Sequence, residues 1–406
     1  MVSFRDPIHG DLIFDGVIEE LILTEEFQRL SEVKQLGLTD KVYPGANHTR
    51  FSHALGTCYL TGELAKRLGV PTKDRMLLQI AALLHDIGHY DFSHAVEHLA
   101  PYDHEENGKW IILGKAELPG RTSGQIAKVL RKHGFKPEDI VQLLHKEGRF
   151  PKFYYTMLSG PLIDCDRMDY LKRDTYCAGA VIGEVDVHRL LGVLVVHPKT
   201  KELGIMHKGV ASLEQFLVAR THMYRQVYMH PDTEAGETML RKAVQSSKKI
   251  AIPLMYGDGH LLARLAEHGS PLTKDLVRRI RAGKRAYYPT AITVDATGSA
   301  KHLLERVRAL YEEEWTDPGH TERELLKRTK LREGQLLVSF PDAKKHKPLP
   351  KFPVLLNEGE WIDFFDVAPI AKAAMEARVS NTALVVYAPL EHVKKVRETT
   401  TAFLQK

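Results

Sequence analysis

Apolar residues recur at helical spacing through most of the first 245 positions of the chain. Side chains three or four positions apart share one face of an α-helix, so these runs predict amphipathic helices. Gly69, Pro71 and Pro101 interrupt the pattern in the way that helix stops do. The runs span residues 21–36, 55–68, 76–84, 122–133, 138–145 and 211–227, and residues 234–245 either continue the last helix or form a following one. We therefore predict a mainly helical core over residues 1–245.

The pattern changes to short strand-like runs near residue 194. Two apolar runs, 194–197 and 203–206, flank a Pro-Lys-Thr-Lys sequence and predict a hairpin. Beyond them, residues 336–340 and 382–387 resemble strands, residues 303–313 and 391–404 resemble helices, and residues 341–353 resemble a loop rich in lysine and proline. The fold class that we predict is mainly α, with the core followed by a smaller α+β lobe over residues 246–406 that packs on it.

Composition narrows the compartment and the class of partner. Three cysteines in 406 residues are too few for a disulfide framework, and the first residues contain no apolar signal segment, so we expect a cytoplasmic protein. No run approaches the roughly 18 apolar residues that span a bilayer, so no membrane partner is expected. The net charge of +5 suits an anionic small molecule and is too small to favour nucleic acid.

The most informative feature is the pair His85-Asp86, which ends the apolar run 77–84. An isolated His-Asp pair most often caps a helix. Here, however, His53 lies upstream and Asp166 lies downstream in an acidic cluster, which makes a metal-ligand set of His53, His85, Asp86 and Asp166 the better interpretation. Imidazole and carboxylate ligands together suit Fe, Mn, Zn or Co better than Ca. A second divalent ion, Mg²⁺ on a substrate triphosphate, is compatible with this set.

Several further segments of the chain carry a resemblance. In order along the chain they are residues 6–10, 27–30, 34–37, 43–53, 84–94 and 164–174. Together they resemble the HD-domain deoxynucleoside triphosphate triphosphohydrolases over residues 5–245, and the resemblance weakens afterwards. It implies an HD-domain helical core without a SAM domain, a metal-dependent dNTPase, and a homo-oligomer (dimer or tetramer) to whose assembly residues 246–406 contribute. The implied reaction is attack of water at the α-phosphorus, which releases the deoxynucleoside and inorganic triphosphate.

The resemblance also implies roles for individual residues. Metal ligands fall on His53, His85, Asp86 and Asp166, and catalytic or phosphate-contacting histidines on His89, His94 and His104. Glu97 lies three positions after His94, so it is expected to orient that imidazole and keep it protonated. The implied substrate contacts are Arg50, Arg167, Tyr170 and Arg220 for phosphate, Gln35 and Asp174 for the sugar 3′-hydroxyl, Leu36 and Tyr228 where a 2′-hydroxyl would have to fit, and Tyr224 near the base.

The chain departs from the vertebrate members of that family at the positions that bind an activating guanine nucleotide. Ser31, Leu23, Met206 and Pro231 replace the expected side chains, and Lys208 is kept. We therefore predict that a GTP-type activator site is missing, and activation by another nucleotide stays open. Two other functions also stay open. One is hydrolysis of a different nucleotide (a monophosphate, a ribonucleotide or a guanosine alarmone), and the other is a single-strand nucleic-acid-binding or nuclease module.

Overall fold

The computed structural model describes residues 1–182, 184–247, 255–283, 286–294, 301–317, 319–341, 348–357, 359–378 and 384–405. These residues divide into two compact units. The first comprises residues 1–224, 252–261 and 349–375, and the second comprises residues 225–251, 262–348 and 376–406. Both units consist of more than one segment, so a single cut at residue 245 describes them only in outline, and that boundary stays a prediction.

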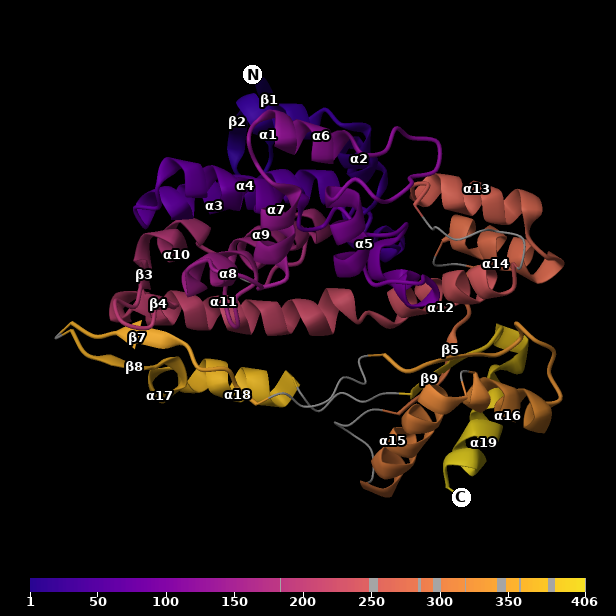
Figure 1. The fold of residues 1–406 in the computed structure, drawn as a ribbon. Helices are drawn as coiled ribbons and strands as arrows, with labels where there is room; N and C mark the ends of the chain where they lie inside the picture. Colours follow the sequence, from indigo (N-terminus) through magenta and orange to yellow (C-terminus); the bar gives the residue numbers. More distant parts are fainter. Residues whose placement is uncertain are drawn as a thin grey trace. The chain divides into compact units, whose positions relative to one another are not determined.

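Helices form the centre of the first unit (Figure 1). The two long helices α3 (Arg50–Arg67) and α4 (Thr72–Leu84) pack against each other, and α3 also packs against α9 (Cys165–Ala178). Gly69, at φ +70°, turns the chain between α3 and α4, as the sequence predicts. The other helices of this unit are α1 (Gly16–Ile22), α2 (Glu25–Gln28), α5 (His104–Ile112), α6 (Gln125–Lys132), α7 (Pro137–Leu144), α8 (Lys152–Leu158), α10 (Val187–Val193), α11 (Val210–Met223), α17 (Phe364–Val367) and most of α18 (Pro369–Arg378).

The prediction of one helix over residues 21–36 is wrong. The chain there forms α1, α2 and a 3₁₀ turn over Arg29–Glu32. Thr24 ends the first helix and starts the second, because its hydroxyl accepts a hydrogen bond from the backbone N–H of Phe27. Apolar spacing does not reveal such a cap. An unpredicted antiparallel hairpin, β1 (Val2–Asp6) with β2 (Gly10–Phe14), precedes these helices.

The predicted hairpin after residue 193 is confirmed. Strands β3 (Leu194–Val196) and β4 (Leu203–Met206) pair antiparallel. β4 then pairs in parallel with β7 (Pro353–Leu355), which pairs antiparallel with β8 (Trp361–Asp363). Residues from the last fifth of the chain therefore complete a sheet of the first unit.

The second unit is a mixed α+β structure, and its sheet has the order β5-β9-β6 with antiparallel pairs. The predicted strands 336–340 and 382–387 correspond to β6 and β9, although residues 382 and 383 lie outside the described part. The predicted helix 303–313 lies within α15, and the predicted helix 391–404 corresponds to α19, which begins two residues later. The elements are α12 (Pro231–Gln245), α14 (Pro271–Ala282), β5 (Thr290–Val294), α15 (Lys301–Thr316), α16 (His320–Thr329), β6 (Leu337–Ser339), β9 (Leu384–Tyr387) and α19 (Val393–Leu404), while α13 (Asp258–His268) begins in the first unit.

The long helix predicted over residues 211–227 ends earlier than expected. α11 stops at Met223 and is followed by a π-helical turn over Tyr224–Tyr228, and Pro231 then begins the separate helix α12. Most of the predicted 341–353 loop precedes β7, with residues 342–347 outside the described part. The mainly α fold class is confirmed. Among the described residues, no helix is both long and apolar enough to cross a membrane.

Candidate metal centre

Three helices of the first unit bring the four predicted metal ligands together. His53 lies in the first turn of α3, His85 and Asp86 follow the last turn of α4, and Asp166 lies in the first turn of α9. Oδ1 of Asp166 is 3.0 Å from Nε2 of His53 and 3.6 Å from Nε2 of His85. The Asp86 carboxylate lies 3.7 Å and 3.4 Å from the same two nitrogens. The convergence that the sequence predicts is therefore present.

The hydrogen bonds of the two imidazoles fit a metal ion. Nδ1 of His53 donates to Asp169 at 2.7 Å, and Nδ1 of His85 donates to the carbonyl of Ala82 at 2.8 Å. Their Nε2 atoms are buried and have no hydrogen-bond partner. Because each Nδ1 carries the proton, each Nε2 lone pair faces the carboxylates, which is the tautomer that metal-ligating histidines adopt. Hence the residues fit a divalent transition metal.

The electrostatics of this cluster also favour a cation. Burial opposes a charge on His53, but the adjacent carboxylates of Asp166 and Asp169 outweigh it and raise the pKa of His53 to about 10. A field that holds a proton so strongly would hold a metal cation at the same point. Burial likewise opposes ionisation of Asp86, yet the adjacent Arg50 guanidinium keeps the pKa of this carboxyl well below its usual range. Asp86 is therefore ionised, as a metal ligand would need to be.

Behind His53 lies a buried network that sequence analysis did not assign. Asp169, one turn after Asp166 on α9, accepts hydrogen bonds from His53 and from Nε2 of His9, both at 2.7 Å. Arg173 donates to both oxygens of Asp169 and to Asp6. Gly56 of α3 is required here, because a Cβ at this position would lie 1.8 Å from Oδ1 of Asp169. The N-terminal hairpin thus supports the orientation of a candidate ligand.

Asp169→Asn is expected to weaken metal binding by roughly 10- to 100-fold, the usual effect of losing such a supporting carboxylate. The amide keeps the shape but no longer holds a full negative charge on the proton of His53. Titration with Mn²⁺ followed by calorimetry measures the affinity. Asp15→Asn is the matched control, because Asp15 is exposed and makes no capping hydrogen bond. Equal affinities in Asp169→Asn and wild type would contradict the role of this network.

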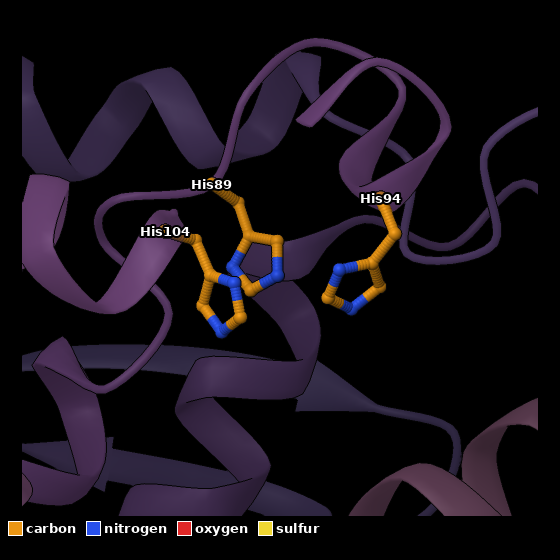
Figure 2. Close-up of side chains that lie close together, drawn as sticks. All are labelled: His89, His94 and His104. Carbon is orange, nitrogen blue, oxygen red and sulfur yellow. The ribbon is translucent and has the colours of Figure 1, made fainter. Parts of the chain in front are cut away.

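The three remaining predicted histidines form a second cluster beside the metal ligands (Figure 2). Nδ1 of His94 and Nδ1 of His104 both donate to Glu97, at 2.6 Å and 2.5 Å. The sequence predicted the first of these bonds, and the second is new. The rings of His89 and His104 stack with their centroids 4.0 Å apart. A single carboxylate therefore orients two imidazoles that lie against a third.

Neighbouring imidazoles in this cluster carry different charges. Burial, together with the charges of Arg50 and of the other two histidines, holds the pKa of His89 well below its ordinary value. Burial opposes the charge of His104 as well, but its hydrogen bond to Glu97 and the charges of Asp86 and Glu97 raise the pKa of His104. The stack thus pairs an imidazole whose neutral form is favoured with one whose protonated form is favoured. A cavity of about 140 Å³ is lined by His104 together with His85, Asp86 and Asp166, so the two clusters share one space.

The predicted phosphate contacts lie around the same helices. Nη1 of Arg167 donates to Asp164 at 2.5 Å, next to Asp166. Nε of Arg220, on α11, donates to the hydroxyl of Tyr170 at 2.8 Å, and its guanidinium lies 5.4 Å from the centroid of the Tyr224 ring. The Tyr170 ring in turn lies 6.4 Å from the ring of His53. These cationic groups are therefore connected to the metal-ligand cluster.

The predicted sugar contacts are arranged around His48. The backbone N–H of Gln35 donates to the carbonyl of His48, and Nε2 of His48 donates to Asp174 at 2.7 Å. Burial opposes the charge on His48, but the bond to Asp174 outweighs it and raises the pKa of His48 to about 9. Oε1 of Gln35 is buried and has no hydrogen-bond partner. Leu36 is adjacent to Gln35, whereas Tyr228 belongs to the second unit and its place at the sugar stays a prediction.

Comparisons with known proteins agree with this geometry. Residues 50–174 match the model of the HD domain, and residues 185–405 match the model of the HD associated region. An uncharacterized protein of Methanocaldococcus jannaschii is 30% identical over 98% of this chain and 81% of that one. The deoxynucleoside triphosphate triphosphohydrolase SAMHD1 of Danio rerio is 30% identical over 60% of this chain, and the match covers 44% of that protein. A crystal structure of a hypothetical protein from Aquifex aeolicus has a TM-score of 0.75 at 26% identity and covers 98% of this chain and 99% of that one.

Proposed function

The chain belongs to the HD phosphohydrolase family, and on this premise we propose that it hydrolyses deoxynucleoside triphosphates to the deoxynucleoside and inorganic triphosphate. The observation that carries the proposal is the convergence of His53, His85, Asp86 and Asp166, with two unpartnered imidazole nitrogens, beside the histidine cluster. The choice of substrate is supported by the vertebrate relatives, whose name states this activity.

In this proposal His53, His85, Asp86 and Asp166 hold one divalent transition metal, either Fe, Mn, Zn or Co. When bound, such an ion lowers the pKa of a coordinated water and neutralises charge that develops on phosphorus. Arg50, Arg167 and Arg220 supply the positive charge for a triphosphate. Their planar guanidinium groups match phosphate oxygens in pairs. Arg50 forms an ion pair with Asp86, and Arg167 forms one with Asp164. These ion pairs fix the orientation of both guanidinium groups before the substrate binds.

The proton for the leaving 5′-oxygen comes from the histidine cluster. His104 is the donor that we favour, because Glu97 raises its pKa and so favours its protonated form. His94 shares the same carboxylate and is the alternative donor. His89 stacks on His104, and its Nε2, which has no hydrogen-bond partner, is free to donate to the α-phosphate when the ring is protonated. Gln35 and Asp174 bind the 3′-hydroxyl, Leu36 and Tyr228 exclude a 2′-hydroxyl, and Tyr224 lies near the base. Assembly as a dimer or tetramer is part of the same proposal.

The direct test is incubation of the pure protein and Mn²⁺ with each of the four dNTPs and four NTPs. Chromatography of the products separates the outcomes. Deoxynucleoside with inorganic triphosphate supports the proposal, whereas orthophosphate or pyrophosphate indicates a phosphohydrolase that attacks another phosphorus. A chain that turns over none of the eight, yet cleaves single-stranded nucleic acid, would be a nuclease.

GTP is expected to raise dNTP hydrolysis by less than a few-fold. The positions that would bind an activating guanine carry Leu23 and Ser31, and both side chains are exposed without a charge to read the base. Initial rates at one fixed dNTP concentration, with and without a non-hydrolysable GTP analogue, measure the effect. A larger activation would mean that the chain has rebuilt this site from other residues. The other nucleotides, tested in the same way, identify any different activator.

A further inference from the structure

A short segment from the associated region lies against the loop that carries His89 and His94. We call residues 88–94 the histidine loop and residues 255–258 the clamp segment. Both oxygens of Asp91, in the loop, accept backbone hydrogen bonds from the clamp: Tyr256 N donates at 3.1 Å and Gly257 N donates at 2.7 Å. Asp91 is fully buried, and its carboxylate holds the two residues that immediately precede α13.

A carboxylate of the clamp segment in turn accepts backbone hydrogen bonds from the histidine loop and from a neighbouring segment. Asp258 is the first residue of α13 and is 5% exposed. Its Oδ1 accepts a hydrogen bond from Phe92 N at 2.6 Å, and its Oδ2 accepts one from Lys34 N at 3.0 Å. One carboxylate therefore ties the histidine loop to residue 34, at the start of the segment that contains Gln35. The chain on both sides of the clamp belongs to the second unit, yet the clamp itself belongs to the first.

The part of the loop that Asp258 holds is strained. Phe92 and Ser93 have φ values of +57° and +56°, and both are non-glycine residues in the left-handed region. Side chains with a Cβ adopt this conformation only when their surroundings impose it. The hydrogen bond from Phe92 N to Asp258 is in a position to impose this conformation. Without it, the two residues are free to relax towards ordinary backbone angles.

The strained turn leads directly to groups of the candidate active site. The Ser93 hydroxyl accepts a hydrogen bond from Nε of Arg50 at 2.8 Å and donates to the carbonyl of Lys34 at 2.7 Å. Arg50 also pairs with the metal-ligand candidate Asp86. His94 is the next residue after Ser93. A shift of this turn would therefore move both a phosphate-binding arginine and a histidine of the cluster.

Packing alone does not explain an aspartate at position 258. Burial raises the pKa of Asp258 to about 7 and that of Asp91 to about 6, so an ionised carboxyl group is costly at both positions. An apolar side chain would fill the volume without this cost. What a carboxylate offers is two acceptor oxygens, and at each position these match two backbone N–H groups.

We propose that Asp258 is a positioning residue that holds the Phe92–Ser93 turn in its left-handed conformation and thereby sets Arg50 and His94 for reaction. This inference rests on the proposed function for its effect on turnover. Its effect on the loop is independent of any substrate. The associated region would then contribute to the active site through the clamp segment.

The test compares Asp258→Asn with wild type in the full chain. The amide keeps one acceptor oxygen but turns an NH₂ group towards the other backbone N–H. Hydrogen exchange followed by mass spectrometry should show faster exchange at the histidine loop, with α3 and α4 unchanged. We expect kcat to fall on the order of tenfold with metal content unchanged, because a small displacement of positioned groups is sufficient for such a loss. Glu267→Gln, on an exposed residue of the same helix, is the matched control.

Each outcome decides the proposal. Unchanged exchange at the histidine loop would overturn it, whether or not the protein hydrolyses dNTPs. Faster exchange in every peptide with an unchanged kcat would assign Asp258 a general stabilising role and would also overturn it. If no substrate is turned over by wild type, the proposed function fails while the exchange experiment still reports on the clamp. If Asp258→Asn does not fold, Asp91→Asn is the second variant. It weakens the hydrogen bonds between the histidine loop and the clamp segment from the loop side, and exchange at the histidine loop is again measured.

Discussion

Asp166→Ala is expected to lower turnover by on the order of 10³-fold or more and to remove the tightly bound metal ion. A single oxygen of Asp166 approaches both candidate imidazole ligands, at 3.0 Å from His53 and 3.6 Å from His85, whereas Asp86 approaches them with two different oxygens. Without it, two imidazoles and Asp86 remain. Asp86 is shared with Arg50, so the remaining set is poor in negative charge.

The variant should still fold, which separates a chemical effect from a structural one. The Asp166 side chain is 32% exposed, and the cap of α9 is made by Asp164, which the substitution leaves in place. Elemental analysis of the purified variant, thermal melting and dNTP hydrolysis measure the three effects. Asp366→Ala, an exposed aspartate of α17, controls for the loss of a surface charge. A folded Asp166→Ala protein that retained stoichiometric metal and turnover would remove the basis of the proposed function.

The metal-ligand candidates could be predicted from the sequence because each stands in a local pattern. His85 and Asp86 are adjacent at the end of an apolar helix, and His53 and Asp166 lie in segments that resemble a known family. Helices α3 and α4 could be predicted because their apolar spacing is regular, whereas the apolar pattern did not reveal α9. The helix predicted over residues 21–36 failed because the hydroxyl of Thr24 starts a new helix inside the periodic run.

Contacts between distant parts of the chain could not be predicted from these patterns. His9 and Asp169 meet across 160 residues, and Phe92 and Asp258 meet across 166. Neither pair has a local pattern, because their geometry depends on how the hairpin and the clamp segment pack on the helices. The hydrogen bond between Glu97 and His104 could be predicted only in part. Both residues lie in a histidine-rich stretch, but only the turn between them brings His104 to the carboxylate that was assigned to His94.

Glu97→Gln is expected to lower kcat by about 10²-fold at neutral pH, the lower end of the contribution of a general acid. The glutamine carbonyl can accept a hydrogen bond from only one of the two imidazoles, since its NH₂ group cannot accept, so the substitution removes the charge together with one hydrogen bond. Burial opposes ionisation of Glu97, but its bonds to His104 and His94 keep the pKa of this carboxyl well below its usual range, so wild type carries a full charge there. Glu117→Gln, on an exposed glutamate, is the matched control.

The pH dependence of this variant has a definite sign. In wild type the carboxylate raises the pKa of His104, so the protonated donor persists to higher pH than it would without Glu97 and is lost as pH rises through that raised value. In Glu97→Gln the opposing effect of burial and the raising effect of Asp86 remain, while the raising effect of Glu97 is removed, so the pKa of His104 falls. The alkaline limb of the kcat profile should therefore move to lower pH, and activity should partly recover as the solution is acidified. A profile that falls uniformly without moving would mean that Glu97 only holds the rings in place, and that the proton comes from another group.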